Sequence, residues 1–168
     1  IIRDMIKGYS VGDVTVRHFN YALIRKEKFE DAHKLLVAFM QNELKPYWNS
    51  GLSPKDITKL IHSQYRNSQL TGYDILKAYT RAEEFSLPQI ISFGNHELLA
   101  LRHWCWNYVK EHTSRIRFEK DKALNLLDSK WDDTRDFAFR FFGTEFTAED
   151  WDSDTLIGIV DSIRPDVE

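Results

Sequence analysis

The sequence ALNLLDSKWDDTRDFAFRFF occupies residues 123–142. Its first five positions are mostly apolar, and residues 128–132 that follow carry the Asp, Ser and Lys side chains typical of turns and helix starts. A second apolar run extends from about Asp133 to Phe142, and Gly143 after it suits a helix C-cap. The stretch therefore predicts two helices joined by a short turn.

The same pattern recurs along the chain with a fixed period. The turn residues Asn95, Asp128 and Asp161 are each 33 apart. With this offset, residues of like size and polarity align in the sets Ile57, Ile90, Ala123 and Leu156; Leu60, Phe93, Leu126 and Ile159; Gly72, Cys105 and Ala138; Tyr73, Trp106 and Phe139; Ile75, Tyr108 and Phe141; Leu76, Val109 and Phe142. A fixed period of this length is the signature of stacked helical repeats. We therefore expect an all-α fold of stacked helical pairs.

The helix boundaries follow from start and stop residues. In the first unit, Ser53-Pro54 begins a helix, residues 66–68 break it, and a second helix is expected from about Gly72 to Phe85. In the second unit, Leu87-Pro88 begins a helix, residues 94–95 break it, and the next helix carries Leu98 to Val109.

The second helices are apolar on nearly every side. Phe137, Phe139 and Phe141 cannot share one narrow stripe, so we expect these helices to be covered on more than one side. The small residues Gly72, Cys105 and Ala138 mark the place where two helices are expected to approach most closely.

The stretch from Leu126 to Ala138 resembles a HEAT repeat. That family has an Asp in the turn, an aliphatic or β-branched residue followed by Arg, and a small residue three positions later. Asp128, Thr134-Arg135 and Ala138 match this pattern. The second unit matches it with substitutions at Asn95, Leu101-Arg102 and Cys105, whereas the first unit departs from it with His62, Ser68-Gln69 and Gly72. The resemblance covers about residues 53–168, and it implies that the stacked helical pairs form a right-handed α–α superhelix of the HEAT-like or ARM type.

The domain organisation expected is a helical pair in residues 1–51 and HEAT-like repeats in 52–168. The first segment does not join the periodic register. Its expected helices are 11–26 and 28–44, the second with an apolar stripe of Phe29, Ala32, Leu35, Leu36, Phe39 and Met40. This pair could cap the first repeat or be a diverged repeat.

The fourth unit contains a first helix, Asp154 to Val160, and a turn at Asp161, and the sequence stops at the position aligned with Thr134. Because Ile1 stands in place of Met and this unit is incomplete, we expect a fragment of a larger protein.

Composition limits the classes of function. The 168 residues are 42% hydrophobic and 29% charged, and no run approaches the roughly 18 uncharged apolar residues of a membrane span. The formal charge of −3 disfavours a dedicated nucleic-acid binder. The single cysteine, Cys105, excludes an internal disulfide and favours the cytoplasm.

Two residue types invite a chemical role. His96-Glu97 begins like a zinc-protease motif, but Ala100 stands where the second His would be, so we interpret His96 as a surface or capping residue. Cys105 lies in the column of small residues, where burial would leave its thiol inert. We expect no catalytic residue, no metal, no cofactor and no enzymatic activity.

Arg102 and Arg135 are interpreted as structural. The HEAT resemblance implies a ladder in which each Arg bonds a turn Asp or a loop carbonyl of its own or an adjacent repeat. The residues concerned are Arg102, Asp128, Arg135 and Asp161. For Arg135 the expected partners are Asp128 or Asp161.

The leading hypothesis is a protein-interaction scaffold, since stacked helical pairs form an extended binding surface. The partner would be another protein or other parts of the parent chain. It is expected on the polar stripe of the second helices: Asp74, Lys77, His103, Asn107, Lys110 and Arg140. The alternative is a nucleic-acid-binding module like the HEAT-like DNA alkylation-repair glycosylases, for which Trp104, Trp131 and Trp151 would supply aromatics.

Overall fold

The computed structural model describes residues 10–26, 30–151 and 157, and in these residues helices are the only regular secondary structure. The expected fourth unit therefore lies, apart from Ile157, outside the described residues, and so does Phe29. The chain forms two compact units, Ile1–Phe85 and Ser86–Glu168. The boundary expected at residue 51 falls inside the first unit, because the N-terminal helices pack against those that follow.

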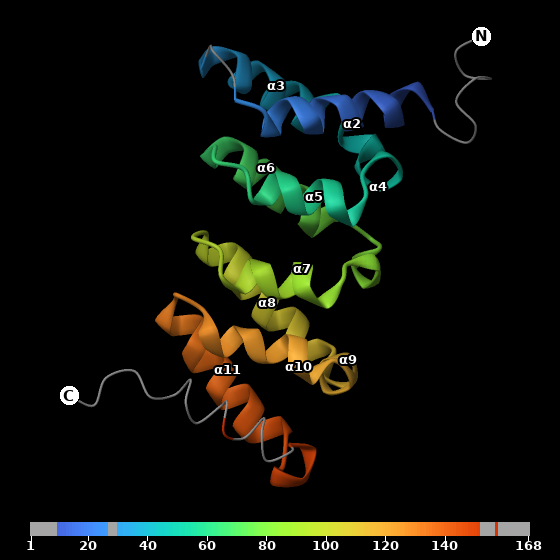
Figure 1. Cartoon of the computed structure of the whole chain (residues 1–168). Coiled ribbons are helices and arrows are strands. Elements are labelled where there is room, and N and C mark those ends of the chain that lie inside the picture. Colours follow the sequence, from blue (N-terminus) through green and yellow to red (C-terminus); the bar gives the residue numbers. More distant parts are fainter. Residues whose placement is uncertain (1–9, 27–29, 152–156, 158–168) are drawn as a thin grey trace. The chain divides into compact units, whose positions relative to one another are not determined.

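The first unit contains five α-helices and two short 3₁₀ turns among its described residues. They are α2 (Val11–Ile24), α3 (Glu30–Asn42), η1 (Lys45–Tyr47), α4 (Trp48–Gly51), α5 (Pro54–Ile61), α6 (Arg66–Ala78) and η2 (Ala82–Glu84). Here α2 packs against α5 and α3 packs against α6, so two helical pairs lie side by side (Figure 1). Their core includes Val16, Leu23, Met40, Trp48, Ile57, Leu60 and Ile75.

The second unit repeats this arrangement. Its elements are α7 (Leu87–Gly94), α8 (Leu99–Glu111), α9 (Thr113–Phe118), α10 (Lys120–Ala123), η3 (Leu124–Asp128), α11 (Asp132–Glu145) and η4 (Ala148–Asp150). Helix α7 packs against α10, and α8 packs against α11.

The helix starts recur at the expected spacing. The first helices α5, α7 and α10 begin at residues 54, 87 and 120, and the second helices α6, α8 and α11 begin at 66, 99 and 132. Local chemistry explains the starts: Ser53 and Ser86 each cap a helix by accepting the backbone N–H three residues later, from Asp56 and Gln89. From α5 onward, one sequence period therefore separates each described pair from the next.

Three turns, those before α6, α8 and α11, repeat the same two hydrogen bonds. The backbone N–H groups of Tyr65, Leu98 and Trp131 each donate to the side chain two residues earlier, at Ser63, His96 and Ser129. The backbone carbonyl of that earlier residue accepts a bond from the side chain six residues later, at Gln69, Arg102 and Arg135. A buried polar side chain, Ser63, His96 or Ser129, thus closes each of these three turns.

Several predicted boundaries were wrong. The second helix of the first unit begins at Arg66 and ends at Ala78, because the bonds from Tyr65 and Gln69 to Ser63 place the turn before residue 66. Gly143 is not a C-cap: α11 continues through it to Glu145.

The small-residue column is buried as expected, at Gly72, Cys105 and Ala138. A Cβ on Gly72 would lie 2.8 Å from Cγ1 of Ile61 and 3.0 Å from its backbone nitrogen. This position therefore allows α6 to lie close against α5.

The predicted apolar stripe of α3 is divided between two sides. Met40 is fully buried, whereas Leu35 is 74% exposed. The exposed side forms an apolar hollow of about 390 Å³, lined by Phe19, Ala32, Leu35, Leu36 and Phe39. Helix α6 packs against α3 and buries only one of the two apolar sides of α3.

Candidate interaction surface

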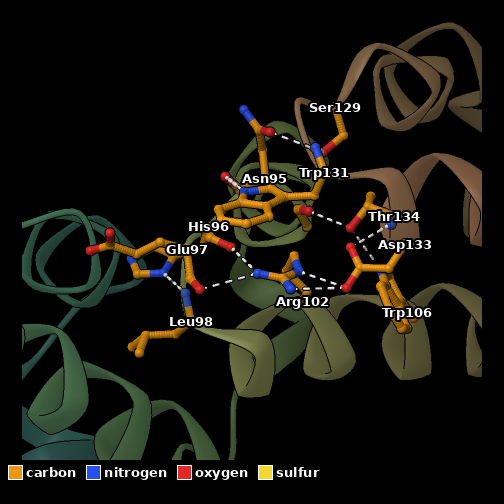
Figure 2. Close-up of polar contacts among 11 residues, drawn as sticks. Asn95, His96, Glu97, Leu98, Arg102, Trp106, Ser129, Trp131, Asp133 and Thr134 are labelled. Atoms are coloured by element: carbon orange, nitrogen blue, oxygen red, sulfur yellow. Dashed lines mark hydrogen bonds and ion pairs between the residues drawn. The ribbon is translucent and has the colours of Figure 1, made fainter.

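The Arg102 side chain makes four hydrogen bonds in the second unit (Figure 2). Its side chain is 8% exposed, and its Nε and Nη2 donate to Oδ2 of Asp133 at 3.2 and 2.9 Å. Its Nη1 donates to the carbonyls of His96 and Glu97 at 3.0 and 3.1 Å. The loop between α7 and α8 is thereby tied to the start of α11.

Trp131 covers this ion pair and adds a second connection. Its ring centroid lies 4.2 Å from the guanidinium carbon of Arg102, and its Nε1 donates to the Asn95 carbonyl at 3.0 Å. The Asn95 side-chain oxygen accepts from the Ser129 hydroxyl at 2.9 Å and from the Lys130 backbone at 3.0 Å. The turns of two successive pairs are therefore bonded to each other.

Thr134 makes the third connection, fully buried at the first turn of α11. Its hydroxyl donates to the Gly94 carbonyl at 2.7 Å and accepts from Nε1 of Trp106 at 3.1 Å. Figure 2 shows these bonds converging on the junction between α8 and α11. We call the set Asn95, Arg102, Trp131, Asp133 and Thr134 the Arg102 clamp.

The ladder expected from the sequence differs in its partners. Arg102 does bond loop carbonyls of its own pair and an acid of the next pair, but the acid is Asp133. Arg135 donates to the carbonyl of Ser129 at 2.6 Å and to the carboxylate of Asp132, and these take the place of the expected Asp128. Asp128 is exposed, and the acid one helical turn before Arg135 is closer in the fold. Asp161 lies outside the described residues.

The residues that invited a chemical role are buried in the second unit. Burial raises the pKa of the Cys105 thiol to about 12, which keeps it protonated and unreactive near neutral pH. Nδ1 of His96 accepts the Leu98 backbone N–H at 3.0 Å, a capping contact within the turn. Among the described residues, no three His, Cys, Asp or Glu side chains are arranged to hold a metal ion.

Four of the predicted partner-binding residues lie on the surface of the second unit. His103, Asn107 and Lys110 are exposed on α8, and Arg140 is exposed on α11. The His103 ring contacts the Trp106 ring at 4.8 Å between centroids, and Trp106 stacks on Phe137 at 5.4 Å. The rings of His103 and Trp106 on α8 and of Phe137 on α11 are therefore in contact with one another, and exposed polar side chains lie on the same two helices.

The aromatic residues of α8 and α11 are covered to different extents, although each helix is covered by more than one other element, as expected. Phe139 is 57% exposed, and Trp106 and Phe137 are half-buried. Phe141 and Phe142 of α11 are buried, so only part of the aromatic surface of this helix is turned toward its neighbours. We call His103, Trp106, Asn107, Lys110, Phe137, Phe139 and Arg140 the ring surface.

The remaining two predicted residues, Asp74 and Lys77, lie on α6 in the first unit. Lys77 Nζ is 3.1 Å from Oδ1 of Asp74, and Gln41 of α3 donates to Oδ2 at 2.9 Å. Both line a hollow of about 440 Å³, together with Gln41, Lys45, Trp48 and Ala78. Gln41, Lys45 and Trp48 were not predicted from the sequence. Gln41 could have been found, because it lies one 33-residue period before Asp74 and so occupies the equivalent position in the preceding helical pair.

Two further findings concern membrane-spanning helices and similarity to known proteins. No helix in the described part of the chain combines the length and the apolar content that crossing a bilayer requires. Comparisons with protein-family models, with curated proteins and with solved structures find no match to this chain.

Proposed function

We propose that this chain is a protein-interaction scaffold, part of a stack of HEAT-like helical pairs whose second helices receive the partner. Three observations support the architecture. Helix starts recur at a fixed period, each described turn repeats the same two hydrogen bonds, and equivalent helices pack on each other within each unit. A right-handed superhelix is the arrangement that such pairs adopt when they continue to stack.

The observation that carries the function is the ring surface of the second unit. The exposed Phe139 and the half-buried rings of Trp106 and Phe137 lie on the same two helices, α8 and α11, as the exposed cations Lys110 and Arg140 and the amide of Asn107. Exposed apolar side chains with a polar border are typical of protein–protein contact sites, and aromatic residues and Arg are enriched there.

The N-terminal pair belongs to the same stack in this proposal. A capping repeat usually presents a polar outer side to solvent. The outer side of α3 instead exposes Leu35 and Phe39, which supports a diverged repeat over a cap.

Photo-cross-linking tests the scaffold proposal. Benzoylphenylalanine would replace Phe139 on the ring surface or Asp121, an exposed residue of α10, in the longest available form of the protein in its host cell. We expect a discrete protein adduct at position 139 and none at 121.

Equal adducts at both positions would contradict a specific interface. Nucleic-acid adducts at 139, with binding that weakens steeply with salt, would favour the alternative of a nucleic-acid module. The net charge of −3 does not support that alternative.

A further inference from the structure

The hollow of the first unit is built from four elements that belong to two separate stretches of sequence, 41–48 and 74–78. Gln41 lies at the end of α3, Lys45 and Trp48 lie in η1 and α4, and Asp74, Lys77 and Ala78 lie at the end of α6. Its volume of about 440 Å³ lies within the range of small-molecule and peptide side-chain sites. It is therefore large enough for more than a single water molecule or side-chain tip.

The one acid that lines this hollow is already neutralised. Oδ1 of Asp74 is paired with Lys77, and Oδ2 accepts the amide of Gln41. The Lys77 ammonium also lies 4.6 Å from the centre of the Tyr73 ring, which holds it in place. Asp74 thus positions one cation and leaves no free carboxylate oxygen to repel an anion.

Lys45 supplies a second cation with no acidic partner among the described residues. Its ammonium lies 5.7 Å from the centre of the Trp48 ring, and no described carboxylate is within ion-pair distance. The site therefore carries one uncompensated positive charge, and Lys77 retains hydrogens that a second acceptor could use.

Backbone carbonyls near the hollow are also occupied. The carbonyl of Met40, in the last turn of α3, accepts Nε1 of Trp48 at 3.2 Å, and the carbonyl of Ala78, the last residue of α6, accepts the amide of Asn49 at 3.2 Å. Unpaired carbonyls at helix C-termini disfavour anions. Because these two are bonded, this source of repulsion is reduced.

We propose that this hollow receives an acidic side chain, Asp or Glu, from an extended acidic segment of the partner, with its carboxylate between the ammonium groups of Lys45 and Lys77. This inference rests on the scaffold proposal and names the chemistry of the partner. Charge-assisted bonds from two ammonium groups would hold the carboxylate, and the exposed Ala78 would contact its methylene groups.

The test uses the full chain and a blocked hexaglutamate peptide, acetylated and amidated so that only side chains are charged. Binding is followed by the indole N–H resonance of Trp48, assigned with Trp48→Phe. We expect saturable shifts at Trp48 and none at Trp104, which lies in the other unit. Lys45→Met should weaken binding about tenfold, the effect of losing one charge-assisted contact. Lys59→Met, an exposed lysine of α5 outside the hollow, is the matched control and should bind as wild type.

Three outcomes would overturn the proposal: no shift at Trp48, equal binding by Lys45→Met, or equal binding of a blocked hexaglutamine peptide. Tighter binding of inorganic phosphate to the same resonances would also overturn it, because the site would then be a phosphate site. The cross-link at position 139 reports on the second unit alone. A specific adduct there without peptide binding here would refute the acidic segment and leave the scaffold standing.

Discussion

The turn of α5–α6 and the turn of α7–α8 have the same geometry and different chemistry. In the first, Nε2 of Gln69 donates to the Ser63 carbonyl at 2.7 Å, and its Oε1 is buried without a hydrogen-bond partner among the described residues. In the second, Arg102 stands one period after Gln69, makes the equivalent bond to His96, and also reaches Glu97 and Asp133.

The difference shows that one backbone geometry can be closed by a neutral amide or by a cation, and only the cation joins neighbouring pairs. An amide has too few donors and too short a reach to bond its own turn and a second helix together, whereas a guanidinium has five donors in a rigid fork. The counterparts of Asp133 and Trp131 one period earlier are Ala100 and Leu98, neither of which could hold a guanidinium. Arg and its acid therefore occur together in this chain.

Of the substitutions that test this difference, Arg102→Ala should lower the free energy of unfolding most. The substitution removes the ion pair with Asp133, two carbonyl bonds and the contact with Trp131. We expect a loss of about 3 kcal/mol in the free energy of unfolding, since bonds to charged groups are worth about 1.5–3 kcal/mol and the ring contact adds to them. Urea denaturation measures this loss, and a change below that of Arg135→Ala would show that the clamp does not stabilise the unit.

Arg135→Ala should have a smaller effect, although Arg135 occupies the equivalent position. Its side chain is 38% exposed and its partner Asp132 is 87% exposed, so the ion pair is screened by water. The bond to the Ser129 carbonyl remains the main contribution, and we expect a loss of about 1 kcal/mol. An unchanged melting temperature would contradict a structural role for Arg135.

Gln69→Leu should have the smallest effect of the three. The substitution leaves the Ser63 carbonyl without its side-chain donor, but it also removes the buried, unpartnered Oε1. These contributions oppose each other, so the free energy of unfolding should change by less than about 1 kcal/mol. A loss as large as that of Arg102→Ala would mean that the neutral amide stabilises its turn as strongly as the cation does.

Much of the local structure could be predicted from sequence. The fixed period and the Ser–Pro helix starts predicted where helices begin, because caps and hydrophobic period depend on a few neighbouring residues. The boundaries that were wrong, at Arg66 and Gly143, depend on bonds from Gln69 to Ser63 and on a helix that continues past a tolerated glycine. These two helix boundaries therefore depend on contacts that the local sequence pattern does not reveal.

The sequence by itself determined the helical class, the starts of α5 and α7, the buried column of Gly72, Cys105 and Ala138, and the polar stripe from which a partner site was predicted. Only the tertiary structure decided which acid meets Arg102, which rings stay exposed, and that Gln41, Lys45 and Trp48 enclose a hollow beside Asp74 and Lys77. The physical reason is the separation along the chain of the residues that interact. Helix starts are set by neighbours a few residues apart, whereas ion pairs, ring exposure and hollows are set by packing between helices whose faces the period alone does not orient.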